Sequence, residues 1–299
     1  MKKNITGIIE SFISHTEKIL KEQGAMHLER GYFPTPNDNL ILPSIEANVK
    51  KSYLQGDGHE WYGKFQASYS SAALVANHFG PFIKPSETTR DLVLPLRDKN
   101  LSDFTEVALE KKLHIPLKGN DPNLDALLEN NDNIIAVESK CIETLNKHRY
   151  KLSDSYLTFI KRELQKPEHM RYDKVWNELI QEKESNLSSF IHLDVAQLVK
   201  HYIGIQCCFN NSTKETILLY LFWEPLNHKE IDVFCSHRNE ISEFIKFVEK
   251  SSTVKFIPLS YLELWDNWGK SLNSSVMQNN QDFWIDFLFK LKKRYCFEV

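Results

Sequence analysis

The spacing of apolar residues predicts helices in the first third of the chain. Residues 5–23 carry apolar side chains near helical spacing, which predicts an amphipathic helix that ends at Gly24. A second helix is predicted over residues 43–54, and a third, rich in small residues, over 68–79. Prolines after residue 80 then break the chain. We therefore expect a helical N-terminal region before any strand.

The middle of the chain changes to a pattern typical of strands. Residues 103–117 show mixed alternation, and residues 123–142 are two apolar segments joined by a polar turn, which predicts a hairpin. Residues 215–223 are almost continuously apolar, as expected for a strand buried on both faces. A further strand is predicted over residues 253–259.

Helical patterns separate these strands and follow them. Residues 146–190 are polar and charged with helical spacing, and we interpret them as a helical insertion. A short helix with an apolar face is predicted over residues 194–206, ending near Gly204, and another helix over 238–250. The order of helix, three strands, helix and strand implies an α/β fold with a mixed sheet covered on both faces.

A chain of 299 residues is long enough for one large domain or two modest ones. We predict a single domain over residues 1–299. Its parts are an N-terminal helical extension at 1–55, a core at 56–260 that contains the insertion at about 146–190, and C-terminal helices at 261–299.

The composition excludes several classes of protein. With 41% hydrophobic and 26% charged residues, the chain is typical of soluble globular proteins. No apolar run approaches the roughly 20 residues of a membrane span, and the N-terminus is not typical of a signal peptide. The five irregularly spaced cysteines indicate reduced thiols and a cytoplasmic location. No Walker loop, G-x-G-x-x-G or G-x-S-x-G motif is present.

The net charge of −3 argues mildly against nucleic-acid binding, because such proteins usually carry a basic surface. Local clusters of cations are nevertheless present. They lie at Lys111–Lys112, Lys147–Lys151, Lys161–Arg162 and Lys290–Arg294. Each is typical of a solvated surface unless the fold brings it close to a functional site.

The hairpin over residues 123–142 carries the strongest candidate for chemistry. Successive residues of a strand point to opposite faces, so Glu138 and Lys140 share one face and Ser139 takes the other. If Asn131 and Asp132 form a two-residue loop, the antiparallel register places Asp125 opposite Glu138. Two carboxylates beside an ammonium could bind a hard cation such as Mg²⁺, with the lysine positioning a water molecule.

The spacing of these residues resembles a nuclease signature. Asp125, followed after twelve residues by Glu138-x-Lys140, is similar to the PD-(D/E)xK motif, with Asp121-Pro122 just upstream. Four flanking blocks, in this order, resemble a bacterial restriction-endonuclease-like family of that superfamily. The four blocks are Gly56-Asp-Gly-His-Glu-Trp61, Ser70–Pro81, Gln197–Tyr202 and Leu219–Pro225.

This resemblance implies a restriction-endonuclease-like αβββαβ core with a central mixed sheet, to which the N-terminal helices and the insertion are added. It also implies a metal-dependent DNA endonuclease that uses Mg²⁺, with Mn²⁺ as a substitute. Asp125, Glu138 and the Ser139 carbonyl would hold the metal, and Lys140 would position the attacking water. DNA is the implied partner, and a homodimer is an analogy with enzymes that cut both strands.

The resemblance assigns roles to several other residues. Glu60 matches the family's first acidic residue and would complete the metal site, although Asp57 competes for that role. Gln197 would support the site from the helix after the insertion. Its spacing of five to Tyr202 departs from the Q-x-x-x-Y pattern of the exonuclease branch. We interpret His201 as a surface histidine of that helix and expect Glu143 to face water.

Two alternatives remain from the sequence. The chain could be a non-catalytic module that binds DNA or joins a complex while it retains the nuclease fold, although all the expected acidic and basic positions are intact. It could also be an unrelated protein in which Glu138-Ser-Lys140 is a chance match. The second alternative predicts that the structure has no cleft lined by carboxylates.

Overall fold

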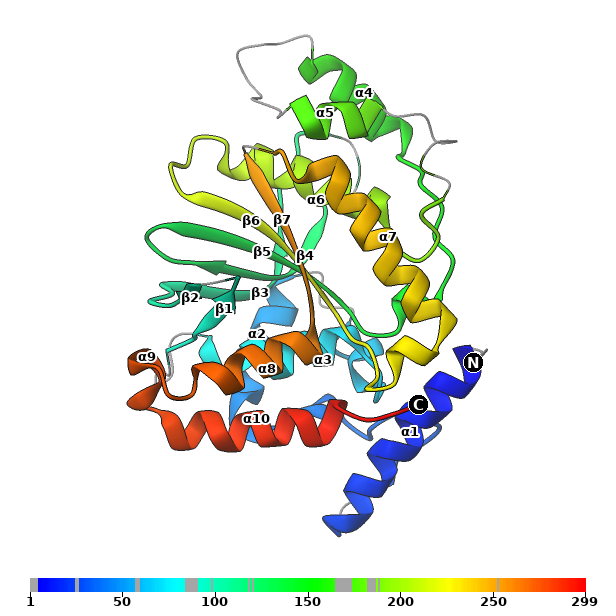
Figure 1. Cartoon of the computed structure of the whole chain (residues 1–299), viewed down its shortest axis with the longest axis vertical. Helices are drawn as coiled ribbons and strands as arrows, with labels where there is room; N and C mark the ends of the chain where they lie inside the picture. Colours follow the sequence, from blue (N-terminus) through cyan, green and yellow to red (C-terminus); the bar gives the residue numbers. More distant parts are fainter. Residues whose placement is uncertain are drawn as a thin grey trace.

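The structure is a computed structural model of the chain, shown in Figure 1. It describes residues 5–24, 27–56, 60–83, 91–97, 99–117, 119, 121–164, 174–181, 187, 189–251 and 253–299. Asp57, the competitor of Glu60 for a role in the site, lies outside the described residues. No helix among the described residues is long and apolar enough to cross a membrane.

A five-stranded mixed sheet stands at the centre of the molecule, with the strand order β3-β4-β5-β6-β7. β4 pairs antiparallel with β3 and β5, whereas β6 pairs parallel with β5 and β7. The strands are β3 (Glu106–Lys112), β4 (Asn123–Glu129), β5 (Asn133–Lys140), β6 (Glu215–Phe222) and β7 (Val254–Ser260). The mixed sheet predicted from the sequence is therefore confirmed.

Helices cover both faces of this sheet (Figure 1). Before the sheet come α1 (Ile5–Glu22), α2 (Glu46–Gln55) and α3 (Ser71–Phe79), close to the predicted bounds. The insertion contains α4 (Asp154–Leu164) and α5 (Lys174–Gln181). The remaining helices are α6 (Val195–Phe209), α7 (Asp232–Val248), α8 (Tyr261–Ser271), α9 (Ser275–Gln278) and α10 (Gln281–Tyr295).

Alternation along the strands produces two apolar cores, one on each face. On β5, Ile135 and Val137 belong to the core that also contains residues of α3, α8 and α10. Ile134 and Ala136 point the other way, into the core formed with α6 and α7. Because β6 contributes to both cores, it is buried along all but its first residue, as its apolar sequence predicted.

Two local predictions need correction. The helix predicted to end near Gly204 continues to Phe209 as α6. A Cβ at Gly204 would lie 2.7 Å from Leu113 Cβ, so this glycine permits the close approach of a helix to the segment after β3. A short hairpin, β1 (Leu94–Leu96) with β2 (Lys99–Leu101), was not predicted, because three-residue strands give almost no alternation signal.

The hairpin of β4 and β5 has the predicted register. Asn130 N–H donates to the Asn133 carbonyl over 3.0 Å, which leaves Asn131 and Asp132 as the two loop residues. The paired rows then run from Glu129 with Ile134 to Ala126 with Val137. One further step along the same register places Asp125 across from Glu138, at the end of the hairpin far from the turn.

Candidate active site

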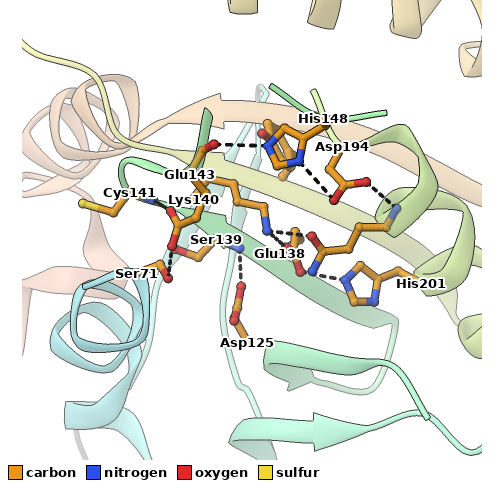
Figure 2. A network of polar contacts seen from close by, with 12 residues as sticks. Ser71, Asp125, Glu138, Ser139, Lys140, Cys141, Glu143, His148, Asp194 and His201 are labelled. Atoms are coloured by element: carbon orange, nitrogen blue, oxygen red, sulfur yellow. Dashed lines mark hydrogen bonds and ion pairs between the residues drawn. The ribbon is translucent and has the colours of Figure 1, made fainter. Parts of the chain in front are cut away.

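Asp125 marks the point at which β4 and β5 stop pairing through their backbones. The last backbone-paired row is Ala126 with Val137, and beyond it the Ser139 N–H donates to Asp125 Oδ2 over 2.6 Å. The carboxylate thus replaces a backbone carbonyl as the acceptor. This bond fixes the position of Asp125 beside the end of β5 (Figure 2).

Alternation along β5 sends its last side chains to different faces, as predicted. Glu138 and Lys140 lie on the face covered by α6, where they form an ion pair. Ser139 points to the other face, and its hydroxyl shares a hydrogen bond of 2.7 Å with the Tyr261 hydroxyl at the start of α8. β5 therefore carries the charged pair on one face of the sheet, and the Ser139 side chain attaches the strand to the start of α8 on the other face.

Helix α6 completes the polar network around the charged pair. Lys140 Nζ donates to Gln197 Oε1 over 2.7 Å, and His201 Nε2 lies 2.7 Å from Glu138 Oε2. Gln197 and His201 are four residues apart and so face the same side of the helix. The predicted supporting role of Gln197 agrees with this contact, but His201 is buried rather than on the surface, so that interpretation was wrong.

The N-terminus of α6 is fixed by a second polar contact chain. Asp194 caps the helix by accepting the Gln197 N–H over 3.0 Å, and it also lies 3.4 Å from His148 Nδ1. The His148 ring in turn contacts the Glu143 carbonyl over 3.1 Å. These contacts hold Gln197 in the position from which it reaches Lys140.

Glu143 does not face water as expected. Its carboxylate accepts the Cys141 N–H over 2.7 Å and the Ser71 hydroxyl of α3 over 2.6 Å. It thereby joins the chain that leaves β5 to the start of α3. The sequence signal for this role was present in retrospect, since a carboxylate two residues after Cys141 can accept that residue's backbone N–H.

Burial makes the charges of this site strongly interdependent. Glu138 has 1% of its side chain exposed and Lys140 has 12%. Burial alone would raise the pKa of Glu138, but its interactions with Lys140 and His201 outweigh burial and lower it. Burial would lower the pKa of Lys140, but Glu138, Asp125 and Glu143 together raise it. Lys140 is therefore held as a cation.

The pKa of Asp125 shifts in the opposite direction to that of Glu138. Burial, followed by the negative charge of Glu138, raises the pKa of the Asp125 carboxyl well above its ordinary value, although Lys140 and the Ser139 N–H partly offset this. Two carboxylates that repel each other in a buried setting gain stability from a nearby cation. The charge of Glu138 therefore acts on Asp125, which lies across from it in the register of the hairpin.

A third carboxylate, which the sequence reasoning missed, contributes to the same site. Glu110 lies in β3, where Leu109 pairs with Ala126 and Lys111 with Leu124, so counting places it across from Asp125. Its negative charge also raises the pKa of Asp125. Glu110 has a φ of 52°, a left-handed backbone that is uncommon for glutamate in a strand. Such strain often accompanies a functional position.

Glu60 lies near this row of carboxylates without bonding to it. Its side chain is 38% exposed and forms an ion pair of 3.7 Å with Lys64. Burial raises the pKa of the Tyr53 hydroxyl, and Glu110, Asp125 and Glu60 all add to that effect. The four side chains therefore share one region, but the ligand-free geometry does not bring Glu60 into contact with Asp125 or Glu138.

The residues around Asp125 fit a hard divalent cation by their donor chemistry. Among the described residues, no group of three His, Cys, Asp or Glu side chains forms a ready-made metal cage. Mg²⁺ is usually bound through one or two carboxylates together with water and phosphate oxygens. Asp125 and Glu138, two carboxylates on neighbouring strands at the end of the hairpin, are ligands of that kind.

Comparison with known proteins identifies the family. No match was found among curated proteins or among solved structures. The sequence model of one family, described as "Restriction Endonuclease associating with ARP", matches residues 10–296. This match spans the five-stranded sheet, both sets of covering helices and the site at the end of β5. The chain therefore belongs to the restriction-endonuclease family that associates with ARP.

Proposed function

We propose that this protein is a Mg²⁺-dependent endonuclease that hydrolyses phosphodiester bonds in DNA. The observation that carries the proposal is the position of Asp125, Glu138 and Lys140 around the end of one hairpin, supported by contacts from α6. Family membership supports the same chemistry. Mn²⁺ is proposed as a substitute metal, since it accepts similar oxygen ligands.

Asp125 and Glu138 would hold the metal, and the Ser139 carbonyl is a further candidate ligand on the same strand. We propose Glu110 rather than Glu60 as the third carboxylate, because Glu110 acts directly on the pKa of Asp125. The bound cation would stabilise negative charge on the scissile phosphate and on the leaving 3′ oxygen. Glu60 could still act from a greater distance.

Lys140 would act as a charged hydrogen-bond donor rather than as a base. Its neighbouring carboxylates raise its pKa, so the ammonium keeps its protons at neutral pH. It would orient the attacking water and stabilise charge near the phosphate, while Gln197 holds the ammonium from α6. The rigid strand and helix keep these groups within hydrogen-bonding distance of one another.

The test is cleavage of a mixed set of linear and supercoiled DNAs by purified protein. We expect cleavage with Mg²⁺ or Mn²⁺ and none with Ca²⁺ alone or with EDTA. Asp125→Ala and Lys140→Ala should each abolish it. Asp121→Ala is the matched control, because Asp121 bonds Ile115 N and His114 instead of the site. Wild-type cleavage by Lys140→Ala would refute the role of that residue.

The second candidate function is a non-catalytic module of a complex. The family's description favours it, because that description names association with ARP. This candidate predicts a folded protein that binds DNA or a partner and cleaves no DNA under any metal condition. A homodimer remains a prediction that sedimentation analysis of the purified chain would test.

A further inference from the structure

A cavity whose lining shares no residue with the site on β5 contains a buried positive charge, which forms no ion pair with a carboxylate among the described residues. The cavity has a volume of about 260 Å³ and lies between α1, the segment of residues 33–43 and α10. Arg294 of α10 lines it and is only 7% exposed. Figure 1 shows α1 and α10 side by side below the sheet.

The partners of Arg294 are all neutral. Its guanidinium donates to the Thr16 hydroxyl, to Asn39 Oδ1 over 3.0 Å and to the Ser68 carbonyl over 3.4 Å. Among the residues that the structure describes, no carboxylate forms an ion pair with it. A buried charge without a counter-charge is costly, and burial accordingly lowers the pKa of this guanidinium.

The acidic residue that lines the cavity does not provide the missing charge. Asp38 Oδ2 accepts the Thr35 N–H over 2.9 Å and the Thr35 hydroxyl over 2.7 Å, so it caps its own short helix. Two further cations, Lys290 and Lys293, line the same cavity, but each already pairs with a carboxylate, Lys290 with Asp286 over 2.8 Å and Lys293 with Glu22 over 3.2 Å. The lining thus carries three basic groups and one acidic group, although the whole chain has a net charge of −3.

Apart from Gln23 and Asn39, the rest of the lining is apolar, and the volume of the cavity limits the size of a ligand. The guanidinium lies 4.9 Å from the centre of the Phe33 ring, which is part of the lining. The other apolar side chains are Ile19, Leu20, Leu40, Ile41 and Pro43. Pockets for drug-sized ligands run from roughly 300 to 1,000 Å³, so this one suits a smaller molecule.

We propose that this cavity binds a small organic anion whose carboxylate or phosphate group lies against Arg294 and Lys293. The apolar body of the ligand would contact Leu20, Phe33 and Ile41. The bound anion would supply the counter-charge that the protein does not provide, and the bond would be charge-assisted. This inference is independent of DNA cleavage, because none of these residues belongs to the site on β5.

The test is isothermal titration calorimetry of the full chain, without DNA or metal, against three probes. Phenyl phosphate and benzoate carry the two anion types on the same ring, and benzyl alcohol is the uncharged control. We expect saturable one-site binding of at least one anion and none of the alcohol. The stronger anion identifies the headgroup. Absence of saturable binding by both anions would overturn the proposal.

Variants separate a ligand site from a structural arginine. Leu20→Trp fills the cavity without removing charge and should abolish binding, and Lys293→Gln should weaken it by about tenfold. Lys292→Gln is the matched control, because Lys292 pairs with Asp266 outside the cavity. Arg294→Gln should lose binding if it folds. Unchanged binding by folded Leu20→Trp would show that the anion binds elsewhere and would overturn the proposal.

Discussion

Lys140 and Arg294 are both largely buried cations, but their surroundings differ. Lys140 contacts Glu138 and lies within the field of Asp125 and Glu143, so carboxylates balance it. Arg294 is surrounded instead by neutral hydrogen-bond acceptors and by the rings of Phe33 and Tyr295. The two cations also lie toward opposite faces of the sheet, since α6 covers the first and α10 packs with the other core.

This difference separates two ways in which a buried charge can serve function. Around Lys140 the protein supplies more negative charge than one lysine neutralises, which favours a second cation such as Mg²⁺. Around Arg294 no carboxylate of the described residues forms an ion pair, which favours an external anion. A buried ion by itself therefore does not define a site, and the sign of the uncompensated charge indicates which ligand fits.

The largest expected effect is on the rate of DNA cleavage. It comes from removing a carboxylate of the site around Lys140. Glu110→Gln should reduce Mg²⁺-dependent cleavage by about 100-fold or more, the range typical of losing one preorganised electrostatic group. Glu60→Gln should reduce it only a few-fold, because Glu60 pairs with Lys64. Single-turnover cleavage rates measure both. A larger loss of activity in Glu60→Gln would instead identify Glu60, the residue that the sequence resemblance implied, as the third carboxylate.

The case of Glu110 illustrates what the sequence could predict. The register of the hairpin, the row of Asp125 and Glu138, and the buried β6 all follow from local alternation and a two-residue turn. No local pattern in the sequence points to Glu110. Its position across from Asp125 depends on how β3 pairs with β4, and the segment that connects these strands does not determine that register. Motif spacing instead favoured Glu60.

The contacts of α6 and α10 show the same limit. The resemblance implied that Gln197 supports the site, but His201 was interpreted as a surface residue. Whether a helical histidine faces a sheet depends on how the helix docks, and Gly204 sets that docking by allowing close approach to Leu113. Arg294 belongs to a basic run that is typical of a solvated surface, and it is buried by packing against α1 and against the segment that contains Phe33 and Asn39.

The next largest expected effect is on the free energy of unfolding, which should differ between variants at the site of Lys140 and at Arg294. Glu138→Ala leaves Lys140 and His201 buried without their carboxylate and should destabilise the fold by about 3–5 kcal/mol. Arg294→Met leaves only neutral acceptors without a donor and should cost about 1–3 kcal/mol. Urea unfolding of each variant gives the free energies. Glu243→Ala, which breaks an exposed ion pair, is the control and should change little.

The pH dependence of these stability differences provides a smaller test. The pKa of Glu138 is lowered in the folded state, below its ordinary value of 4.5, so its contribution is fully present above that value. The contribution is lost as the pH falls through the lower folded pKa. The stability gap between wild type and Glu138→Gln should therefore shrink below pH 4.5, by about 1.4 kcal/mol per unit of pKa shift.

The corresponding gap for Arg294→Met should stay constant over the same range. Neither arginine nor methionine titrates between pH 3 and 7, and the neutral partners of Arg294 do not either. Urea unfolding at several pH values measures both gaps against wild type. A gap for Glu138→Gln that widens on acidification would contradict the assigned direction of the Glu138 shift.

Exposed cations beside the site should give the smallest effect, because their charge is already solvated. Lys147, Arg149 and Lys151 are exposed on the extended segment that follows the end of β5, whereas His148 and Tyr150 between them face inward. This alternation presents three cations on one side of the segment. We expect them to contact DNA phosphates close to the metal site.

Neutralising all three residues should weaken DNA binding and lower its salt dependence by up to about three units of slope, one for each lost phosphate contact. Metal binding should not change, because the carboxylates of the site remain. Fluorescence anisotropy over a range of salt concentrations measures the slope. The matched control neutralises Lys18, Lys21 and Lys51, three exposed lysines of α1 and α2. An equal effect from both triple variants would mean that binding follows net charge, and that DNA has no defined path beside β5.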